Sequence, residues 1–390
     1  MRNAISLMFI FSCTLTAFAR EEVKRDFQRT VTIPVGHSFK LVSSFGNVSI
    51  HRQSGRAAAI RASIECSADS NADAQKLCTD IQISVQEGNN GVTVDTGFPQ
   101  YAGSRNIGFR VNYDIALPDD TPLNVQNRFG DVTLTDVRGD ATVHNANGSV
   151  RMAGGGGRRD IDNMFGNVEL RSEQGQIKVT NASGDVVVDN NTGAVRADNR
   201  FGDVTVTNNG GNVTISSSSG SVALSNIAGE VSVTHSFGPV SLKSVSDAAK
   251  VQNKNGSVTL DDVAGAITVR SSFQGVTITN PGGSITVDNQ NGPLTVEARE
   301  GRRCQDILLR TTFAPMRVRV PAAHGYMLDA RTTGGKVNAD FQLEDPGRNT
   351  STRNGPARDS SIVGRIPGRN GTCGLQLTNQ HGNIDIVRGK

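Results

Sequence analysis

Hydrophobic and polar residues alternate in a nine-residue cycle that runs without insertion or deletion from Phe129 to about Glu300. Every ninth position from Gly130 to Gly292 holds glycine or a residue that stands in for it, and the second and fourth residues after it are mostly Val, Ile or Leu. Strict alternation predicts a five-residue strand with one buried and one exposed face. Gly, Asn, Asp and Ser fill the other four positions and predict a turn.

One such unit cannot fold alone. Burying its two aliphatic side chains contributes roughly 3–6 kcal/mol, whereas ordering nine residues costs about 9–18 kcal/mol of backbone entropy. Successive units must therefore stack and share hydrogen bonds, which predicts an all-β fold, a single-stranded β-solenoid. At two strands per coil and about 4.8 Å between coils, the regular units predict a rod of roughly 45 Å before its ends are added.

A second period lies on top of the first, because Phe-Gly recurs every 36 residues. It occurs at Phe129, Phe165, Phe201 and Phe237, and Phe273-Gln274 continues the series. This four-strand super-repeat fits a coil of either 18 or 36 residues. We favour 18, because two facing sheets about 10 Å apart are filled by Val and Ile. Small residues would then lie between successive phenylalanines, namely Asn147, Ser183, Ser219, Asn255 and Asn291. A 36-residue coil with an unbroken phenylalanine ladder is the alternative.

The regions on either side of the repeat predict less regular β structure. We expect residues 20–128 to form an N-terminal β-rich capping region, residues 129–300 the regular solenoid, and residues 301–390 a C-terminal β-rich region that continues or caps it. One short helix is expected from Asp69 to Thr79. The stretch from Asp345 to Asn370 is rich in Arg, Gly, Asn, Pro and Ser and is expected to be a flexible loop.

The first nineteen residues, 1–19, resemble an export signal. Arg2 supplies a positive charge, an apolar core follows, and Ala17-Phe18-Ala19 has the small-x-small form of a cleavage site. We therefore expect an exported chain that begins near Arg20 and is periplasmic, cell-surface or secreted. No later segment approaches the roughly 20 apolar residues of a spanning helix, so no membrane span is expected. An alternative is a lipid anchor at Cys13, whose preceding residues faintly resemble a lipoprotein cleavage site.

Removal of that segment leaves four cysteines, and an even number in an exported chain predicts two disulfides. Sequence alone allows three connectivities. We favour Cys66–Cys78 and Cys304–Cys373, because each pair lies outside the repeat and would tie one terminal region. No CxxC motif occurs and the six histidines are scattered singly, so neither a metal site nor a cofactor is expected.

The formal net charge of +3 is unevenly distributed. Residues 299–390 carry fifteen Lys or Arg against eight Asp or Glu, whereas residues 20–298 carry 24 against 29. A basic end attracts anionic polymers or lipid headgroups, and Arg302 and Arg303 are its candidate anion contacts. A solvated, arginine-rich surface is the simpler interpretation, and we expect no nucleic-acid partner.

The least regular unit of the repeat is Gly154-Gly-Gly-Gly-Arg-Arg-Asp-Ile, in which Arg159 takes a position that should be aliphatic. One interpretation is an anion site made of exposed amides with Arg158 and Arg159. The other, which we favour, is a local bulge at which the strand is lost. A nucleotide-binding loop is excluded because no Gly-Lys-Ser/Thr follows.

Three other functions fit the repeat less well. Calcium-binding nonapeptide repeats share the period but need Asp at a fixed place in each unit, which is lacking here. A polysaccharide lyase or glycosidase needs clustered carboxylates or a cationic base on one strand face, and the third strand position instead holds inert residues. This position is threonine at 259, 268, 277, 286 and 295. Such a column also resembles ice-binding solenoids, although Glu169, Lys178 and Arg196 interrupt it elsewhere.

The order of several short motifs carries a family resemblance. They are Tyr113-Asp-Ile-Ala-Leu-Pro, Leu123-Asn-Val-Gln-Asn-Arg-Phe-Gly-Asp-Val, the G-x-V-x-[VIL] series, Val318-Arg-Val-Pro and the terminal Gly-Asn-Ile-Asp-Ile. On these motifs the chain resembles the bacterial putative-adhesin family of β-strand-repeat domains, a family of largely unknown function. The resemblance implies an exported β-solenoid with an adhesive or scaffolding role, and it supplies no catalytic residues.

The residues and the resemblance together predict a non-enzymatic, adhesin-like binding or scaffolding protein of the bacterial cell envelope. Its expected partner is an envelope polysaccharide or another surface protein, and its oligomeric state is left open. The alternative hypothesis is a carbohydrate-active enzyme on a β-helix, which would rely on Arg158, Arg159 and Asp160. Histidines such as His51, His144 and His235 stand singly among polar residues and form no Ser-His-Asp arrangement.

Overall fold

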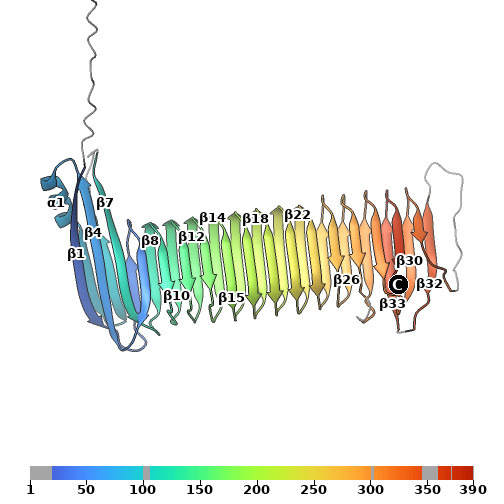
Figure 1. The fold of residues 1–390 in the computed structure, drawn as a ribbon, viewed down its shortest axis with the longest axis horizontal. Coiled ribbons are helices and arrows are strands. Elements are labelled where there is room, and N and C mark those ends of the chain that lie inside the picture. Colours follow the sequence, from blue (N-terminus) through green and yellow to red (C-terminus); the bar gives the residue numbers. More distant parts are fainter. Residues whose placement is uncertain (1–19, 100–105, 300–302, 345–358, 370, 390) are drawn as a thin grey trace, which may run out of the picture.

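The computed structural model describes residues 20–99, 106–299, 303–344, 359–369 and 371–389. It is a long rod of stacked coils with α1 (Asn71–Asp80) at its N-terminal end (Figure 1). Each coil places one strand in each of two sheets, called A and B below. Successive coils pair in parallel with an offset of 18 residues, since Val132 lies opposite Val150 in sheet A and Val143 opposite Ile161 in sheet B. The predicted β-solenoid with an 18-residue coil is confirmed, and the 36-residue coil is wrong.

Sheet A consists of seventeen strands in the described residues, each hydrogen-bonded to the next. In spatial order they are β1 (Glu21–Thr32), β4 (Ala57–Ala68), β7 (Gly108–Pro118), β3 (Val48–Gln53), β9 (Val132–Thr135), β11 (Val150–Ala153), β13 (Val168–Arg171), β15 (Val186–Asn191), β17 (Val204–Asn209), β19 (Val222–Ile227), β21 (Val240–Val245), β23 (Val258–Val263), β25 (Val276–Thr279), β27 (Leu294–Glu297), β29 (Met316–Val320), β34 (Ile384–Arg388) and β31 (Val337–Ala339).

Sheet B also has seventeen strands in the part of the chain that the structure describes. In spatial order they are β5 (Gln82–Gly88), β6 (Gly91–Gly97), β2 (Ser38–Val42), β8 (Leu123–Phe129), β10 (Ala141–Asn147), β12 (Arg159–Phe165), β14 (Ile177–Ser183), β16 (Val195–Phe201), β18 (Val213–Ser219), β20 (Val231–Phe237), β22 (Ala249–Asn255), β24 (Ile267–Ser271), β26 (Ile285–Asn289), β28 (Ile307–Thr311), β33 (Thr372–Asn379), β30 (Gly325–Thr332) and β32 (Ser360–Ile366).

The inward Val, Ile and Leu residues of both sheets form one continuous hydrophobic core along the rod. A ladder of buried asparagines lines the corner where sheet B ends. The amide of Asn163 donates to the carbonyl of Gly166 (2.9 Å) and to the side-chain oxygen of Asn181 (3.1 Å) in the next coil. The amide of Asn181 repeats the first of these bonds with Gly184 (3.0 Å). Each buried amide therefore holds its own turn, and several also bond to the next coil.

At both ends of the rod the order of the coils in space differs from their order along the chain. At the N-terminal end, the coil of β2 and β3 lies between the strands β6 and β7 and the strands β8 and β9. At the C-terminal end, the coil of β33 and β34 lies between β28 and β29 on one side and β30 and β31 on the other. Neither end can therefore unwind one coil at a time in chain order.

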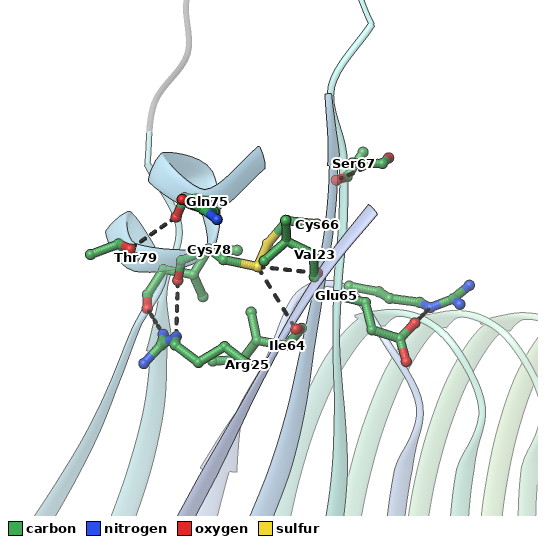
Figure 2. The surroundings of a disulfide bond; sticks show 12 residues. Val23, Arg25, Ile64, Glu65, Cys66, Ser67, Gln75, Cys78 and Thr79 are labelled. Carbon is green, nitrogen blue, oxygen red and sulfur yellow. Dashed lines mark hydrogen bonds and ion pairs between the residues drawn. A yellow bond between two sulfur atoms is a disulfide. The ribbon is translucent and has the colours of Figure 1, made fainter. Parts of the chain in front are cut away.

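Each interleaved end contains one of the two predicted disulfides, Cys66–Cys78 and Cys304–Cys373, with the expected pairing. Figure 2 shows the first, which joins α1 to β4. Arg25 of β1 donates its Nε to the carbonyl of Cys78 (3.1 Å) and so holds the helix against the last strand of sheet A. The helix predicted from Asp69 to Thr79 is confirmed within two residues at its start and one at its end.

Two local expectations need correction, and a third lies outside the described residues. The strand is not lost at Arg159, because this residue begins β12 and pairs in register with Ile177. Part of the loop expected from Asp345 to Asn370 is strand β32, which pairs with β30, while 345–358 and 370 lie outside the described residues. The expected signal segment, 1–19, lies outside them as well. Among the described residues, no helix is long and apolar enough to cross a membrane.

Candidate binding surface

One edge of the rod carries a regular row of exposed phenylalanine side chains, which we call the aromatic ridge. It consists of Phe129, Phe165, Phe201, Phe237, Phe273 and Phe313, and each residue is between 42% and 60% exposed. Alternation along a sheet-B strand would turn these side chains inward. The chain instead bends at the following residue, which in Gly130 has φ +126° and in Gly166 +125°, and the ring points outward at the corner.

The register of sheet B places the rings two coils apart. Phe129 is opposite Asn147, which is opposite Phe165, and Phe165 is opposite Ser183. With coils about 4.8 Å apart, neighbouring rings are about 9.6 Å apart along the rod. We call the five gaps between them the slots. Their floors are Asn147, Ser183, Ser219, Asn255 and Asn291.

Stacked rings close the ridge at both ends. Phe45, one coil before Phe129, lies with its ring centroid 5.1 Å away and its plane at 4° to that of Phe129. His381 stacks on Phe313 in the same way, at 5.1 Å and 13°. The fold thus tolerates a ring in every coil at this corner, and it does so at both ends of the row.

Few charges flank the ridge, and they balance. On the sheet-B side, one residue directly precedes each ring or slot floor in the sequence. This residue is a cation in three coils, at Arg128, Arg200 and Lys254, and is neutral in the others. The guanidinium of Arg200 lies 5.6 Å from the centroid of Phe201, within reach of a cation–π interaction. On the sheet-A side, three carboxylates occupy the matching turn position, at 131, 185 and 203.

Those carboxylates serve the rod itself. Asp185 accepts the backbone N–H of Asp203 (2.9 Å), and Asp203 accepts that of Ser221 (2.7 Å) one coil further on. The pKa of Asp131 lies below its usual range. Burial, the largest single influence, opposes ionisation, but the hydrogen bonds from Arg151 and from the backbone N–H of Ser149, with the Arg151 charge, outweigh it. The ridge therefore presents apolar rings on a polar edge with no strong net charge.

Shallow polar hollows lie beside the ridge on the outer face of sheet B. One, of about 470 Å³, is lined by Met164 and Arg200, the residues that directly precede two of the rings, and by polar residues that include Asp162, Thr180 and Ser216. A second, of about 320 Å³, lies further along and includes Gln252. They offer hydroxyl, amide and carboxylate groups next to apolar rings.

The structure separates the residues that sequence analysis considered as anion contacts. Arg159 is 1% exposed, and its Nε donates to Glu173 across 2.8 Å inside the core. It is therefore unavailable to an external anion or to the catalysis considered above. Arg158 is exposed and lies 3.4 Å from Asp160. Arg303 is exposed and precedes β28, eight strands beyond β12 in sheet B, while Arg302 lies outside the described residues.

The remaining candidates stay dispersed. His51 lies beside Asp114 (3.3 Å) and His144 beside Asp162 (3.6 Å), whereas His235 is buried in the asparagine ladder, 3.2 Å from the carbonyl of Ser217. The threonine column divides between two faces, since 259, 277 and 295 lie in sheet A and 268 and 286 in sheet B. Within the described ranges, no group of three His, Cys, Asp or Glu residues could hold a metal ion.

Sequence reasoning found the phenylalanine period but missed the exposure of the rings. The available signal was the Phe-Gly dipeptide at four of the six rings, where a glycine with positive φ directly after the ring redirects the chain out of strand alternation. Phe273 and Phe313 are followed by Gln274 and Ala314 and gave no such signal. No other aromatic column of this length exists among the described strands. The aromatic ridge is therefore the candidate binding surface.

Comparison with known proteins gives only distant likenesses. No protein-family model and no curated protein matches this sequence. Among solved structures, it is similar to a putative cell adhesion protein from Clostridium sporogenes (12% identity, 94% of this chain and 100% of that chain, TM-score 0.19). It is also similar to a putative adhesin from Bacteroides fragilis (12% identity, 72% and 97%, TM-score 0.26) and to a putative lipid binding protein from Parabacteroides distasonis (12% identity, 73% and 93%, TM-score 0.19).

Two of these three proteins are named as adhesion proteins. At such identities and TM-scores the likeness carries no argument about function. The function proposed below rests on the residues of this chain.

Proposed function

We propose that this protein is a non-enzymatic, adhesin-like rod that binds or scaffolds at the bacterial cell envelope through its aromatic ridge. Export is supported by the signal-like sequence of residues 1–19 and by two disulfides, which persist in oxidising compartments. The observation that carries the proposal is the row of six half-exposed rings on a rod whose other outward positions are mostly small and polar.

Covering the exposed rings with a partner would contribute a substantial free energy of binding. An aromatic side chain has roughly 150–250 Å² of surface, so covering the exposed half of one ring contributes about 2–3 kcal/mol at 25 cal/mol per Å². Apolar groups gathered along one exposed edge mark a surface that meets a partner more often than apolar groups scattered singly. The neutral flanks favour a partner that is recognised by stacking rather than by charge.

The test uses the chain from Arg20 to Lys390 and a variant in which Phe165, Phe201 and Phe237 are changed to serine. Serine already occupies the same corner at two slots, so this variant should keep the fold. A matched control changes three outward-facing residues of sheet A, the exposed Thr259 and the half-buried Thr277 and Thr295, to serine. Binding to purified envelope polysaccharides and to outer-surface protein fractions is measured at low and physiological salt.

We expect the wild-type chain and the threonine control to bind, and the ridge variant to bind at least ten-fold more weakly at either salt concentration. Binding that disappears with salt while surviving the ridge substitutions would instead assign the contact to the basic C-terminal region. Absence of binding by the wild-type chain in every fraction would contradict the proposal.

A further inference from the structure

We propose that the ridge pairs with the ridge of a second copy of this chain, with the rings of each copy inserted into the slots of the other. This inference rests on the proposed function, because it takes the ridge as the contact surface. It names the partner as a second rod that lies alongside the first.

The dimensions of a slot fit one aromatic ring. Stacked rings in this protein are 5.1 Å apart, both at Phe45–Phe129 and at Phe313–His381. The two rings that bound a slot are about 9.6 Å apart, which is close to two such stacking distances. A ring supplied from outside would therefore contact a ring on each side. Asn and Ser at the slot floors are small enough to leave that space open.

The ends of the ridge limit this arrangement to its middle. One coil before Phe129 the stacking position is filled by Phe45, and one coil after Phe313 it is filled by His381. Between them, five slots alternate with six rings. The rod thus carries both halves of the proposed contact in a defined number and order.

Two copies can satisfy this contact symmetrically. Rings lie an even number of coils from one another, and every slot lies an odd number of coils from every ring. A two-fold rotation centred midway between Phe201 and Ser219 therefore places five of the six rings of each copy in the five slots of the other, giving an antiparallel, closed dimer of the commonest symmetry. The sixth ring, Phe313, then lies beside Phe45 of the second copy. The flanking cations Arg128, Arg200 and Lys254 are three or four coils apart along each copy, and in this register only the two Arg200 side chains come within one coil of each other.

The area is sufficient for a dimer of modest affinity. Five half-exposed rings per copy cover roughly 500 Å², or about 1,000 Å² for the pair, which is near the lower limit of specific interfaces. Pairing end to end through the terminal strand is less favourable at the N-terminal end, because β1 carries a charged sequence, Glu-Glu-Val-Lys-Arg-Asp, which opposes strand addition.

The experiment measures self-association of the chain from Arg20 to Lys390 by sedimentation over a wide concentration range. It compares wild type with the ridge variant (Phe165, Phe201 and Phe237 to serine) and with a slot-filled variant, Ser183→Phe with Ser219→Phe. The slot-filled variant has more exposed aromatic surface but no vacant slots in the middle of the ridge. Its fold is secured by the precedent of stacked rings at both ends, and circular dichroism checks it.

We expect a concentration-dependent dimer for wild type and a dimer dissociation constant at least ten-fold higher for both variants. A wild-type chain that stays monomeric throughout would overturn the inference. So would a slot-filled variant that associates as well as wild type or better, because that outcome marks unspecific association of apolar surface. If wild type is monomeric while the ridge variant still loses binding to an envelope polymer, the proposed function stands and the partner is that polymer.

Discussion

The buried ion pair between Arg159 and Glu173 offers a direct test of how this core is held together. Both side chains are 2% exposed, and the Arg159 guanidinium also donates to the carbonyls of Val137 and Gly139. In the next coil, the positions equivalent to Arg159 and Glu173 hold Ile177 and Asn191, both buried. Changing Arg159 to Ile and Glu173 to Asn, singly and together, therefore installs residues that this corner already accepts one coil away.

The magnitudes follow from burial and distance. Unit charges about 4 Å apart interact by about 4 kcal/mol at an effective dielectric constant of 20, and breaking a buried pair typically costs 3–5 kcal/mol because one charge is left without its partner. We expect about 3–5 kcal/mol of destabilisation for either single change. The double variant should lie within about 1–2 kcal/mol of wild type, because apolar or neutral replacement of a whole buried pair is often neutral.

Urea unfolding followed by far-ultraviolet circular dichroism measures these differences, since the chain has no tryptophan. The coupling energy from the four proteins should be at least about 3 kcal/mol. As a control, Arg158→Ala removes the adjacent exposed arginine and should change stability by less than about 0.5 kcal/mol. If the double variant loses as much as the two single variants combined, the two residues are not a pair and the reasoning is refuted.

Three further changes test the ends and the corners of the rod. Burial raises the pKa of Tyr113 to about 12. The free energy of unfolding should therefore fall by up to about 2.7 kcal/mol as the pH rises from 10 to 12, because the unfolded chain loses this proton first. Tyr113→Phe should remove this part of the alkaline transition. Changing Cys304 and Cys373 to Ala, which opens a bridge across 69 residues, should cost about 4 kcal/mol and lower the hydrogen-exchange protection of β33 and β34 first. Gly184→Ala places a Cβ 2.2 Å from a backbone oxygen at φ +124° and should cost about 3 kcal/mol or more, whereas Gly55→Ala, at φ +84° with open space around it, should cost about 1 kcal/mol in thermal unfolding.

The regular part of the fold follows from local pattern because every coil repeats the same problem. Val204 and Val206 alternate with threonines and must face the core, and the residues aligned with them 18 positions earlier and later, Val186, Val188, Val222 and Leu224, are buried as well. Register is then fixed, since a shift by one residue would expose every valine. The pairing of four cysteines also followed from their position outside the repeat.

Other features depend on residues that meet only in three dimensions. Arg159 and Glu173 are 14 residues apart, and their pairing requires knowing that two different columns adjoin at one corner of the coil. The order of the last coils is equally hidden, because β30 and β33 are both acceptable neighbours for β28 by pattern alone. Antiparallel pairing along β30 also gave strand structure to residues whose composition predicted a loop.

The doubled period of the sequence is not explained by the fold. A coil needs only 18 residues, and the inward aliphatic columns repeat at 18. Crowding does not force rings into alternate coils, since Phe45 and Phe129 occupy adjacent coils without displacing either turn. The stacked ends of the ridge fold without alternation of ring and small residue. Nothing inside the chain therefore requires that alternation along the middle of the ridge. On the function proposed above, the vacant, ring-sized slots receive a partner, and the 36-residue period then serves recognition, whereas the 18-residue period serves folding.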